Sequence, residues 1–315
     1  MVIQYHASFF VHALGVLESI KIFSNMKRKM TLFIAAFAVA ALCFAACGHE
    51  GGNEEEEGGG GSINQEYPST ADVIRNAVTD IDGNKYDAVR IGNQVWMASN
   101  LRTTRYPDGT AIPLGEALGE LYSFTDPYRY APGTYGSNED NMINVPAYGY
   151  LYNWAAVMHG AESSESNPSG VQGICPKGWH VPSDKEWTQL KDYMKTRPEY
   201  MSSGNSNYLA KALAATWGWR SSSEPDDVGY EPSTTNNATG FSALPAGLLY
   251  YDFDNDISGS YYGNYIDFGH GAYFWSSTEK GSDGAWFRYL YYMDEGVYRH
   301  NNDKFHGFSV RCVRD

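Results

Sequence analysis

Hydrophobic and polar positions divide the chain into an N-terminal apolar run and a longer, mixed part. Residues 31–46 form a run of sixteen residues without a charge, directly after the basic cluster MKRKM. A membrane-spanning helix needs roughly 20 apolar residues, so this run has the length of the apolar core of a secretion signal instead. From residue 71 onward, apolar and polar residues alternate in short groups, which is typical of a globular domain.

Two segments of the globular part have the spacing of amphipathic helices. Segment 182–198 places Trp187, Leu190 and Met194 on one helical face, and a Ser-Asp-Lys-Glu capping box precedes them. Segment 207–219 is rich in alanine and carries two leucines four residues apart on one stripe. The pattern predicts a helix over each of these segments.

Short β-rich runs fill most of the remaining domain. Residues 86–101 hold two such runs around a Gly-Asn turn and predict a hairpin, and residues 148–154 predict a strand that leads into a short helix ending at Gly160. From about residue 220 onward, short apolar runs alternate with loops rich in Gly, Ser, Tyr, Asp and Asn. Two helices with many short strands predict a single α+β domain over residues 71–315.

Cys47 lies where the apolar run gives way to a segment rich in glycine and glutamate. A basic start, an apolar run, two alanines and a cysteine resemble a bacterial lipoprotein signal, in which the cysteine is lipidated and becomes the N-terminus. Phe44 departs from that pattern, because leucine is usual there. The alternatives are a signal cleaved elsewhere and an uncleaved anchor.

These features predict four parts along the chain. Residues 1–25 do not fit a signal and are interpreted as a gene-model extension, since the methionine that follows directly precedes the basic cluster. Residues 26–46 are the predicted lipoprotein signal peptide, residues 47–70 a flexible acidic tether, and residues 71–315 the globular domain. The tether has too little apolar surface to offset the entropy of ordering it.

The tether also bears on localisation. Glu54 to Glu57 follow the cysteine closely, and such a run resembles the surface-export signal of Bacteroidetes lipoproteins. A plain acidic spacer is the alternative. We expect a protein held on the lipid bilayer of the outer membrane by N-terminal acyl groups such as palmitate, with its domain exposed at the cell surface.

The net charge restricts the partners of the chain. The formal net charge is −14, and removal of residues 1–46, with four basic residues and one acidic residue, leaves −14 − 3 = −17. Nucleic-acid binding is excluded because phosphate contacts need clustered Lys and Arg. Adsorption of the protein surface to anionic lipids is disfavoured for the same reason.

Two cysteines remain in the expected domain. Cys43 leaves with the signal and Cys47 carries the lipid, which leaves Cys175 and Cys312. An even pair in an exported chain predicts a disulfide, and two buried free thiols are the alternative.

Several runs of the domain together resemble one family. They are VTDIDGNKYDAVRIGNQVWMASNL, YGYLYNWAAV, GICPKGWHVPSDKEWTQL, TGFSALPAG, FWSSTE and FSVRCVRD, in this order from about Val78 to the C-terminus. They resemble the Fibrobacter succinogenes major paralogous domain, which is common in lipoproteins of Bacteroidetes and Fibrobacteres. The resemblance implies a fold similar to C-type lectins and formylglycine-generating enzymes, with two helices beside short antiparallel strands and long loops. It implies no particular activity.

The sequence carries no recognisable catalytic motif. It contains no HExxH, no GxSxG, no P-loop and no Rossmann glycine pattern. His180 lies inside the motif GWHVP and is interpreted as a packed structural histidine. Formylglycine-generating relatives depend on cysteine chemistry, and a disulfide between the two domain cysteines would leave no free thiol for it. We therefore expect no enzymatic activity and no cofactor.

Two acidic segments are candidates for calcium binding. Asp252, Asp254 and Asp256 stand at every second position, as in an EF-hand, but an isoleucine and a glycine occupy the sixth and twelfth positions, where that loop requires Gly and Glu. The run EPDD, residues 224–227, resembles the Glu-Pro-Asn motif of C-type lectins. Solvated acidic loops are the alternative for both segments, and we expect no metal site.

Residues 250–275 have the composition of a binding loop. Tyrosine supplies contact area at low entropy cost, and Gly, Ser, Asn and Asp supply adaptable polar groups. Packing of the tyrosines onto their own domain is the alternative. The expected ligand, a glycan or a protein, would contact Tyr251, Asp252, Asp254, Asp256, Tyr261, Tyr262 and Tyr265.

Three functions are compatible with these features. The first is a surface lipoprotein that binds a glycan or a protein as an adhesin. The second is a structural component of the cell envelope without a small ligand, and the third is a calcium-dependent lectin. Binding to a glycan array, measured with and without a chelator, separates the three.

Overall fold

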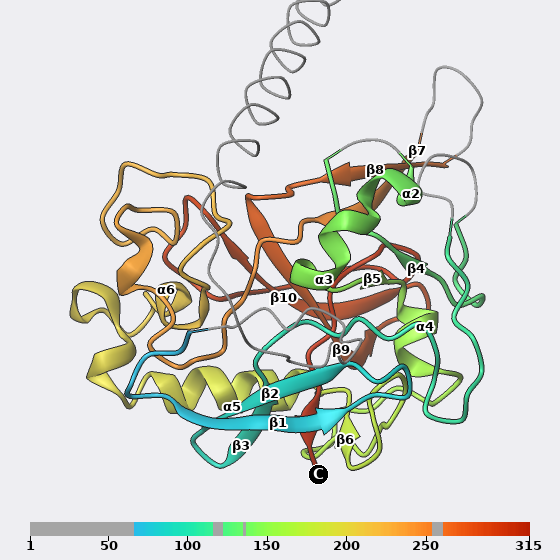
Figure 1. Cartoon of the computed structure of the whole chain (residues 1–315), viewed down its shortest axis with the longest axis horizontal. Helices are drawn as coiled ribbons and strands as arrows, with labels where there is room; N and C mark the ends of the chain where they lie inside the picture. The colour runs from blue at the N-terminus through green and yellow to red at the C-terminus, as the bar shows by residue number, and fades with distance from the viewer. Residues whose placement is uncertain (1–65, 116–121, 135–136, 254–260) are drawn as a thin grey trace, which may run out of the picture. The chain divides into compact units, whose positions relative to one another are not determined.

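The computed structural model of the chain describes residues 66–115, 122–134, 137–253 and 261–315 (Figure 1). The lipidation candidate Cys47 lies outside these residues, as do Asp254 and Asp256. Within the described ranges, no helix combines the length and the apolar character needed to cross a membrane.

The largest sheet has five strands in the order β1-β2-β3-β12-β6, and each neighbouring pair is antiparallel. The C-terminal strand β12 lies between β3 and β6, so the sheet joins segments from both ends of the domain (Figure 1). The strands are β1 (Asp72–Thr79), β2 (Lys85–Ile91), β3 (Gln94–Met97), β6 (Trp179–His180) and β12 (Val313–Arg314).

The predicted hairpin of residues 86–101 is confirmed by β2 and β3. Ile91 pairs with Gln94 across the turn, and Gly92 has a φ of 62°, a left-handed conformation that glycine adopts without strain. A Cβ on Gly92 would lie 2.9 Å from the ring of Tyr193, so glycine also allows the turn to approach that ring closely.

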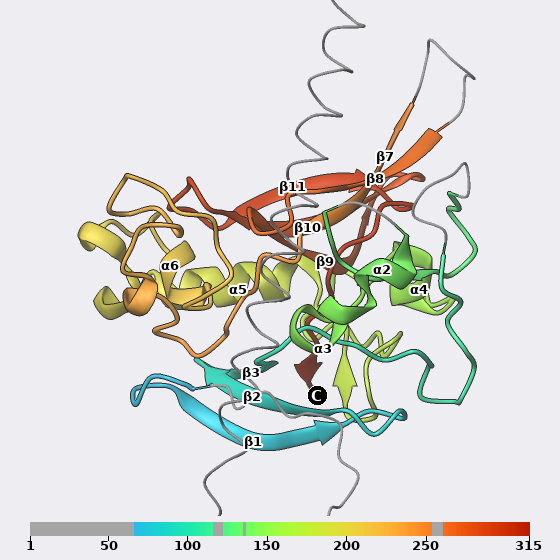
Figure 2. The ribbon, with the colours of Figure 1, turned by 45° about the horizontal axis from the view of Figure 1, so that its top comes forward.

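Three smaller antiparallel sheets complete the described β structure (Figure 2). One has the strand order β11-β10-β9, and the other two are the pairs β4–β5 and β7–β8. The strand β5 lies within the predicted strand 148–154 and is shorter than predicted. The bounds are β4 (Arg129–Tyr130), β5 (Leu151–Tyr152), β7 (Leu248–Phe253), β8 (Tyr261–Ile266), β9 (Gly271–Lys280), β10 (Gly284–Tyr291) and β11 (Tyr298–Asp303).

The first predicted helix is confirmed as α5 (Asp184–Met194). Its capping box is present: the Ser183 hydroxyl accepts from the Glu186 amide at 3.2 Å, and the Glu186 carboxylate accepts from the Ser183 amide at 2.9 Å. The other helices are one turn or little more: α2 (Asn138–Asn141), α3 (Val145–Tyr148), α4 (Trp154–Met158) and α6 (Ala210–Leu213), with the 3-10 turns η1 (Met142–Asn144), η2 (Pro198–Tyr200), η3 (Ser202–Gly204) and η4 (Ser233–Thr235).

The predicted helix over residues 207–219 is wrong beyond α6. The backbone becomes extended at Ala214, with φ −69° and ψ 140°. Ala215 then donates its amide to the carbonyl of Ala243 at 2.8 Å, and Ala243 donates to the carbonyl of Leu213 at 2.8 Å. Pairing with a segment nearly 30 residues away therefore overrides the helical propensity of the alanines.

The expected α+β fold similar to C-type lectins, with two helices, is also wrong. Strands hold more of the described residues than helices do, and α5 is the only described helix longer than five residues. Hydrogen bonds between distant segments take up the backbone groups that a second long helix would need. The described domain is mainly β, built from several small antiparallel sheets.

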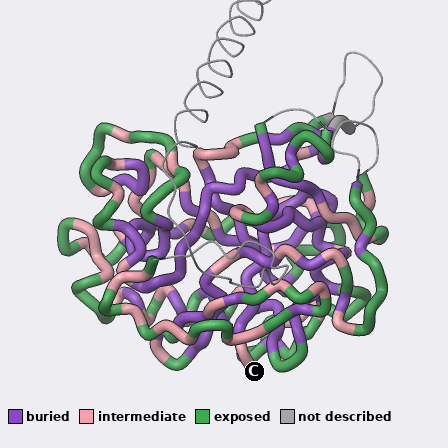
Figure 3. The backbone as a smooth tube through the Cα atoms, viewed as in Figure 1, coloured by how far each residue is buried: buried purple, intermediate pink, exposed green. Residues whose placement is uncertain are grey.

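Buried aromatic side chains connect α5 to the sheets. Trp96 of β3 lies 4.5 Å from Trp187 of α5 between ring centroids, and Trp187 lies 5.6 Å from Phe274 of β9. All three rings are nearly inaccessible to solvent. The buried segments lie in the interior in Figure 3, and exposed loops surround them. Burial of the apolar faces of α5 and β9 against one another stabilises this arrangement.

Candidate functional site

The predicted ligand-binding loop is largely a β-hairpin, formed by β7 and β8. Alternation along the two strands points Tyr251 and Tyr265 to the same face, where they are 1 % and 7 % exposed. They pack with Leu249 and Phe305 in one apolar cluster. The expectation that these two tyrosines contact a ligand is therefore wrong, because the domain itself covers their rings.

Only some of the other residues predicted to contact the ligand lie among the residues that the structure describes. Asp252 of β7 is exposed. Asp254 and Asp256 lie outside the described residues, and for Tyr261 and Tyr262 only the strand position in β8 is described. In the described residues, no group of three or more His, Cys, Asp or Glu side chains is arranged to hold a metal ion.

The acidic run EPDD makes hydrogen bonds within the domain. Asp226 accepts from the Ser203 hydroxyl at 2.6 Å, and Asp227 accepts from the hydroxyl of Ser222. Its two aspartates are therefore engaged by neighbouring loops.

A cleft of about 510 Å³ lies on another part of the domain. Its walls come from three segments: the turn at Pro107 and Asp108, the end of α4 and the residues after it from Met158 to Glu162, and the loop 170–173. This volume falls within the range of roughly 300 to 1,000 Å³ that is usual for ligand sites.

His159 ends α4 and forms one side of the cleft. It has φ 50° and ψ 42°, a left-handed conformation in which glycine or asparagine is more common. The imidazole stacks on the ring of Tyr106 at 3.6 Å between centroids, and Nε2 lies 3.3 Å from a carboxylate oxygen of Asp108. The strained backbone thus holds the imidazole between helix α4 and the 106–110 turn.

The turn supports this arrangement. Hydrogen bonds from the backbone and side chain of Thr110 lower the pKa of Asp108, and His159 adds to that effect. Tyr106 is 1 % exposed and its hydroxyl has no hydrogen-bond partner among the described side chains and backbone. Burial, followed by the charge of Asp108, raises the pKa of Tyr106. The carboxylate is therefore ionised near neutral pH while the phenol stays neutral.

The loop 170–173 is held close to α4. Gly173 has φ 49°, and a Cβ at this position would clash with the carbonyl oxygen of Val157. Ile174 donates its amide to the same carbonyl at 2.9 Å, and Val181 donates to the carbonyl of Val171 at 2.8 Å. Glycine is required here because the loop touches the helix backbone.

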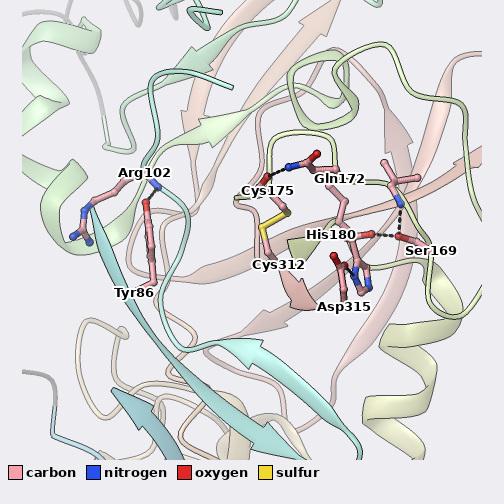
Figure 4. Close-up of a disulfide and its surroundings, with 10 residues drawn as sticks. Tyr86, Arg102, Ser169, Gln172, Cys175, His180, Cys312 and Asp315 are labelled. Atoms are coloured by element: carbon pink, nitrogen blue, oxygen red, sulfur yellow. Dashed lines mark hydrogen bonds and ion pairs between the residues drawn. A yellow bond between two sulfur atoms is a disulfide. The ribbon is translucent and has the colours of Figure 1, made fainter. Parts of the chain in front are cut away.

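The predicted disulfide between Cys175 and Cys312 is confirmed, with 5.9 Å between the Cα atoms. Figure 4 shows the bond beside Gln172, whose amide reaches the carbonyl of Cys175 at 3.5 Å. The disulfide therefore ties the loop that forms a wall of the cleft to the segment that leads into β12.

His180 helps to hold the loop 170–173 through its contact with Glu186. Its Nε2 lies 2.7 Å from a carboxylate oxygen of Glu186, and its Nδ1 lies 2.7 Å from one of Asp315 (Figure 4 shows the second pair). Glu186 also accepts from the backbone amide of Ser169 at 3.0 Å, directly before the cleft loop. The interpretation of His180 as a packed structural histidine agrees with these contacts and with its 2 % exposure.

The cleft can bind polar groups. Its lining combines the carboxylates of Asp108 and Glu162, the imidazole of His159 and the amide of Gln172 with the apolar side chains of Pro107, Met158 and Val171. Glu162 and Gln172 are exposed residues, so a molecule in the cleft can reach them from solvent. Among the described residues that line the cleft there is no Ser, Thr, Cys or Lys that could serve as a nucleophile.

Sequence reasoning did not select this cleft. The predicted end of a short helix at Gly160 is confirmed by α4 (Trp154–Met158), and the His-Gly pair that ends it was the one local signal. The partners Tyr106 and Asp108 lie some 50 residues earlier, and the loop 170–173 lies beyond, so their meeting depends on the tertiary fold.

Comparison with known families gives one match. The model of the family described as the Fibrobacter succinogenes major domain matches residues 89–314, which include every residue that lines the cleft. No curated protein and no solved structure matches the chain.

Proposed function

Because the chain belongs to the Fibrobacter succinogenes major domain family, which favours a non-enzymatic surface or envelope protein, we propose that it is a surface lipoprotein that binds a glycan. The domain would be tethered to the outer membrane through acyl groups on Cys47. Its ligand would occupy the cleft beside His159, and no reaction would follow binding.

The anchor is supported by the order of residues before and after Cys47. Basic residues, sixteen uncharged residues and two alanines precede the cysteine, and a glycine-rich acidic segment follows it. With a net charge of −17 after removal of residues 1–46, acyl chains rather than basic side chains would hold the protein on the bilayer.

The single observation that carries the glycan proposal is the lining of the cleft. Hydroxyl groups both donate and accept hydrogen bonds, and Asp108 and Glu162 offer acceptors while Gln172 offers both roles. The half-buried ring of Pro107 offers apolar surface for a sugar ring, whereas Met158 and Val171 are buried and close the cleft toward the core. Two carboxylates against one imidazole disfavour an acidic sugar, so the ligand would be neutral or carry an amine.

The test is a glycan array probed with the full chain in detergent. We expect binding to a group of neutral or amino sugars that chelation of calcium leaves unchanged. Asp108→Asn and Gln172→Ala should each weaken this binding roughly 10- to 100-fold, the usual effect of losing a hydrogen bond to a charged or ordered group.

His159→Gly is the sharpest variant. Glycine is favoured at the left-handed position that His159 occupies, so the backbone is retained while the imidazole is lost. Binding should fall and stability should not. The matched control is Asp192→Asn, which neutralises an exposed carboxylate paired with Lys195 on α5 and should change nothing. Failure of every glycan to bind would favour a structural envelope role.

A further inference from the structure

Lys211 is a buried lysine whose ammonium group has no ion-pair partner among the described residues. This residue of α6 is only 8 % exposed, although lysine is almost never buried unless it is paired. Its Nζ donates one hydrogen bond, to the carbonyl of Pro225 at 3.0 Å, and lies 5.4 Å from the ring of Tyr230. An ammonium group has three donors, so hydrogen-bonding capacity remains.

A second, smaller pocket of about 270 Å³ adjoins this lysine. It lies between the segment that follows α5, residues 199–203, and the loops at 225–226 and 235–238. This volume is just below the range of roughly 300 to 1,000 Å³ for drug-sized ligands, so it suits a smaller molecule. None of its lining residues belongs to the cleft beside His159.

The pocket contains an ammonium group and a carboxylate that form no ion pair with each other. Asp226 lines it together with Lys211 and attracts the ammonium, yet no ion pair within 4 Å joins the two among the described residues. The carboxylate of Asp226 is held by the Ser203 hydroxyl at 2.6 and 2.8 Å. Ser203 has φ 47°, a strained left-handed conformation that places its hydroxyl on this carboxylate.

Apolar side chains form another part of the lining, beside the polar residues Glu199, Ser202 and Thr235. Tyr200, Met201 and Ala238 are partly buried and pack against the core around Trp187. A ligand with both charges and an apolar group would therefore find a partner for each part. A simple anion would be repelled by Asp226 and Glu199, and a simple amine would leave the lysine uncompensated.

We propose that this pocket binds a free α-amino acid with an apolar side chain. Its carboxylate would accept from the Nζ of Lys211, its ammonium would donate to Asp226, and its side chain would lie against Tyr200 and Met201. The pKa of Lys211 is lowered by burial, and a bound carboxylate would restore a stable ammonium. This site is independent of the glycan cleft.

The experiment is isothermal titration calorimetry of the full chain in detergent with L-leucine as the probe. We expect saturable binding of leucine. Isoamylamine, which lacks the carboxylate, and 4-methylpentanoate, which lacks the amine, should each bind at least about tenfold more weakly. Equal binding of either half-ligand, or no saturable heat with leucine, overturns the proposal.

Two variants test the residues. Lys211→Met keeps the length and apolar stem of the side chain, and Asp226→Asn keeps its shape; each should weaken leucine binding about tenfold or more. The matched control is Lys195→Met, which replaces a half-buried lysine whose partner is Asp192, and this variant should bind leucine normally. Circular dichroism checks folding, and undiminished binding by a folded Asp226→Asn protein would also overturn the proposal.

Discussion

A single histidine, His180, joins the C-terminal residue Asp315 to the start of α5. Burial by itself lowers its pKa, but hydrogen bonds and charge attraction from Glu186 and then Asp315 outweigh that effect, so the net pKa is raised above its usual value. The protonated imidazole donates to both carboxylates, which are the charged groups that face it. The charge state of one residue thereby affects the loop behind the cleft.

The raised pKa has a definite consequence for stability. A group whose pKa is higher in the folded state stabilises the fold fully below the unfolded value, about 6.5 for histidine, and loses that contribution as the pH rises through the folded value. We expect the urea concentration at the unfolding midpoint to decrease as the pH is raised from 6 to 9. The His180→Gln variant should lose about 3 kcal/mol of unfolding free energy at pH 6. Its unfolding midpoint should then depend less on pH than that of the parent protein.

The control for this experiment is His300→Gln. His300 is exposed, and its Nδ1 lies close to the carbonyl of its neighbour Asn301. This variant should keep the pH dependence of the parent. If His180→Gln retained the full decline between pH 6 and pH 9, the protonated bridge would not be its cause.

At the scale of elements, the segment from residue 169 to residue 182 connects the cleft, the disulfide and α5. The amide of Ile174 donates to the Val157 carbonyl of α4 on one side, and Glu186 of α5 accepts from the backbone amide of Ser169 on the other. The family motif GICPKGWHVPSDKEWTQL covers most of this segment. Its histidine and glutamate hydrogen-bond to each other, and the glutamate holds the backbone at the start of the cleft loop.

Two glycines of this segment provide a matched comparison. Gly173 and Gly178 both have positive φ, but a Cβ on Gly173 would clash with the Val157 carbonyl, whereas a Cβ on Gly178 has nothing within 4 Å. Alanine at either site should cost roughly 1 to 2 kcal/mol for the backbone alone. Gly173→Ala should cost clearly more in denaturant unfolding and should weaken ligand binding in the cleft; equal losses for both variants would contradict the close packing of loop and helix.

The disulfide makes a separate contribution. It closes a loop across a sequence separation of 137 residues, and chain entropy gives at most about 5 kcal/mol of stabilisation for a loop of that length. We expect the double variant Cys175→Ala, Cys312→Ala to unfold at a lower urea concentration than the parent protein. A reducing agent should lower the unfolding midpoint of the parent protein but not that of the variant. An unchanged midpoint in both proteins would show that the sheet around β12 holds without the bond.

For the whole molecule, the proposed lipid anchor on Cys47 would decide where the domain acts. On partition between a detergent phase and an aqueous phase, the mature protein should enter the detergent phase, and Cys47→Ala should move it to the aqueous phase. Mass spectrometry of the N-terminal peptide should show acyl groups on Cys47. An unmodified cysteine, or a mature chain that starts elsewhere, would contradict lipidation while leaving the two binding proposals intact.

Features that depend on neighbouring residues could be predicted from the amino-acid sequence. The hairpin of β2 and β3 follows from β-rich runs around Gly92, and α5 follows from the capping box of Ser183 and Glu186 with an apolar face. Hydrogen bonds in turns and caps join residues a few positions apart, so their partners can be read directly from the sequence. The disulfide was predicted from a count of the cysteines that would remain if the chain is exported, and the structure contains it.

The other features follow from the packing of distant segments against one another. The alanine-rich segment ends its helix at Leu213 because Ala243 pairs with it, and Tyr251 and Tyr265 are covered because strand alternation turns them toward Phe305. The cleft exists because a strained histidine after α4 meets a turn some 50 residues earlier. Each outcome depends on contacts between segments that are distant in the chain, and local propensity and composition carry no information about which distant segment will supply the partner.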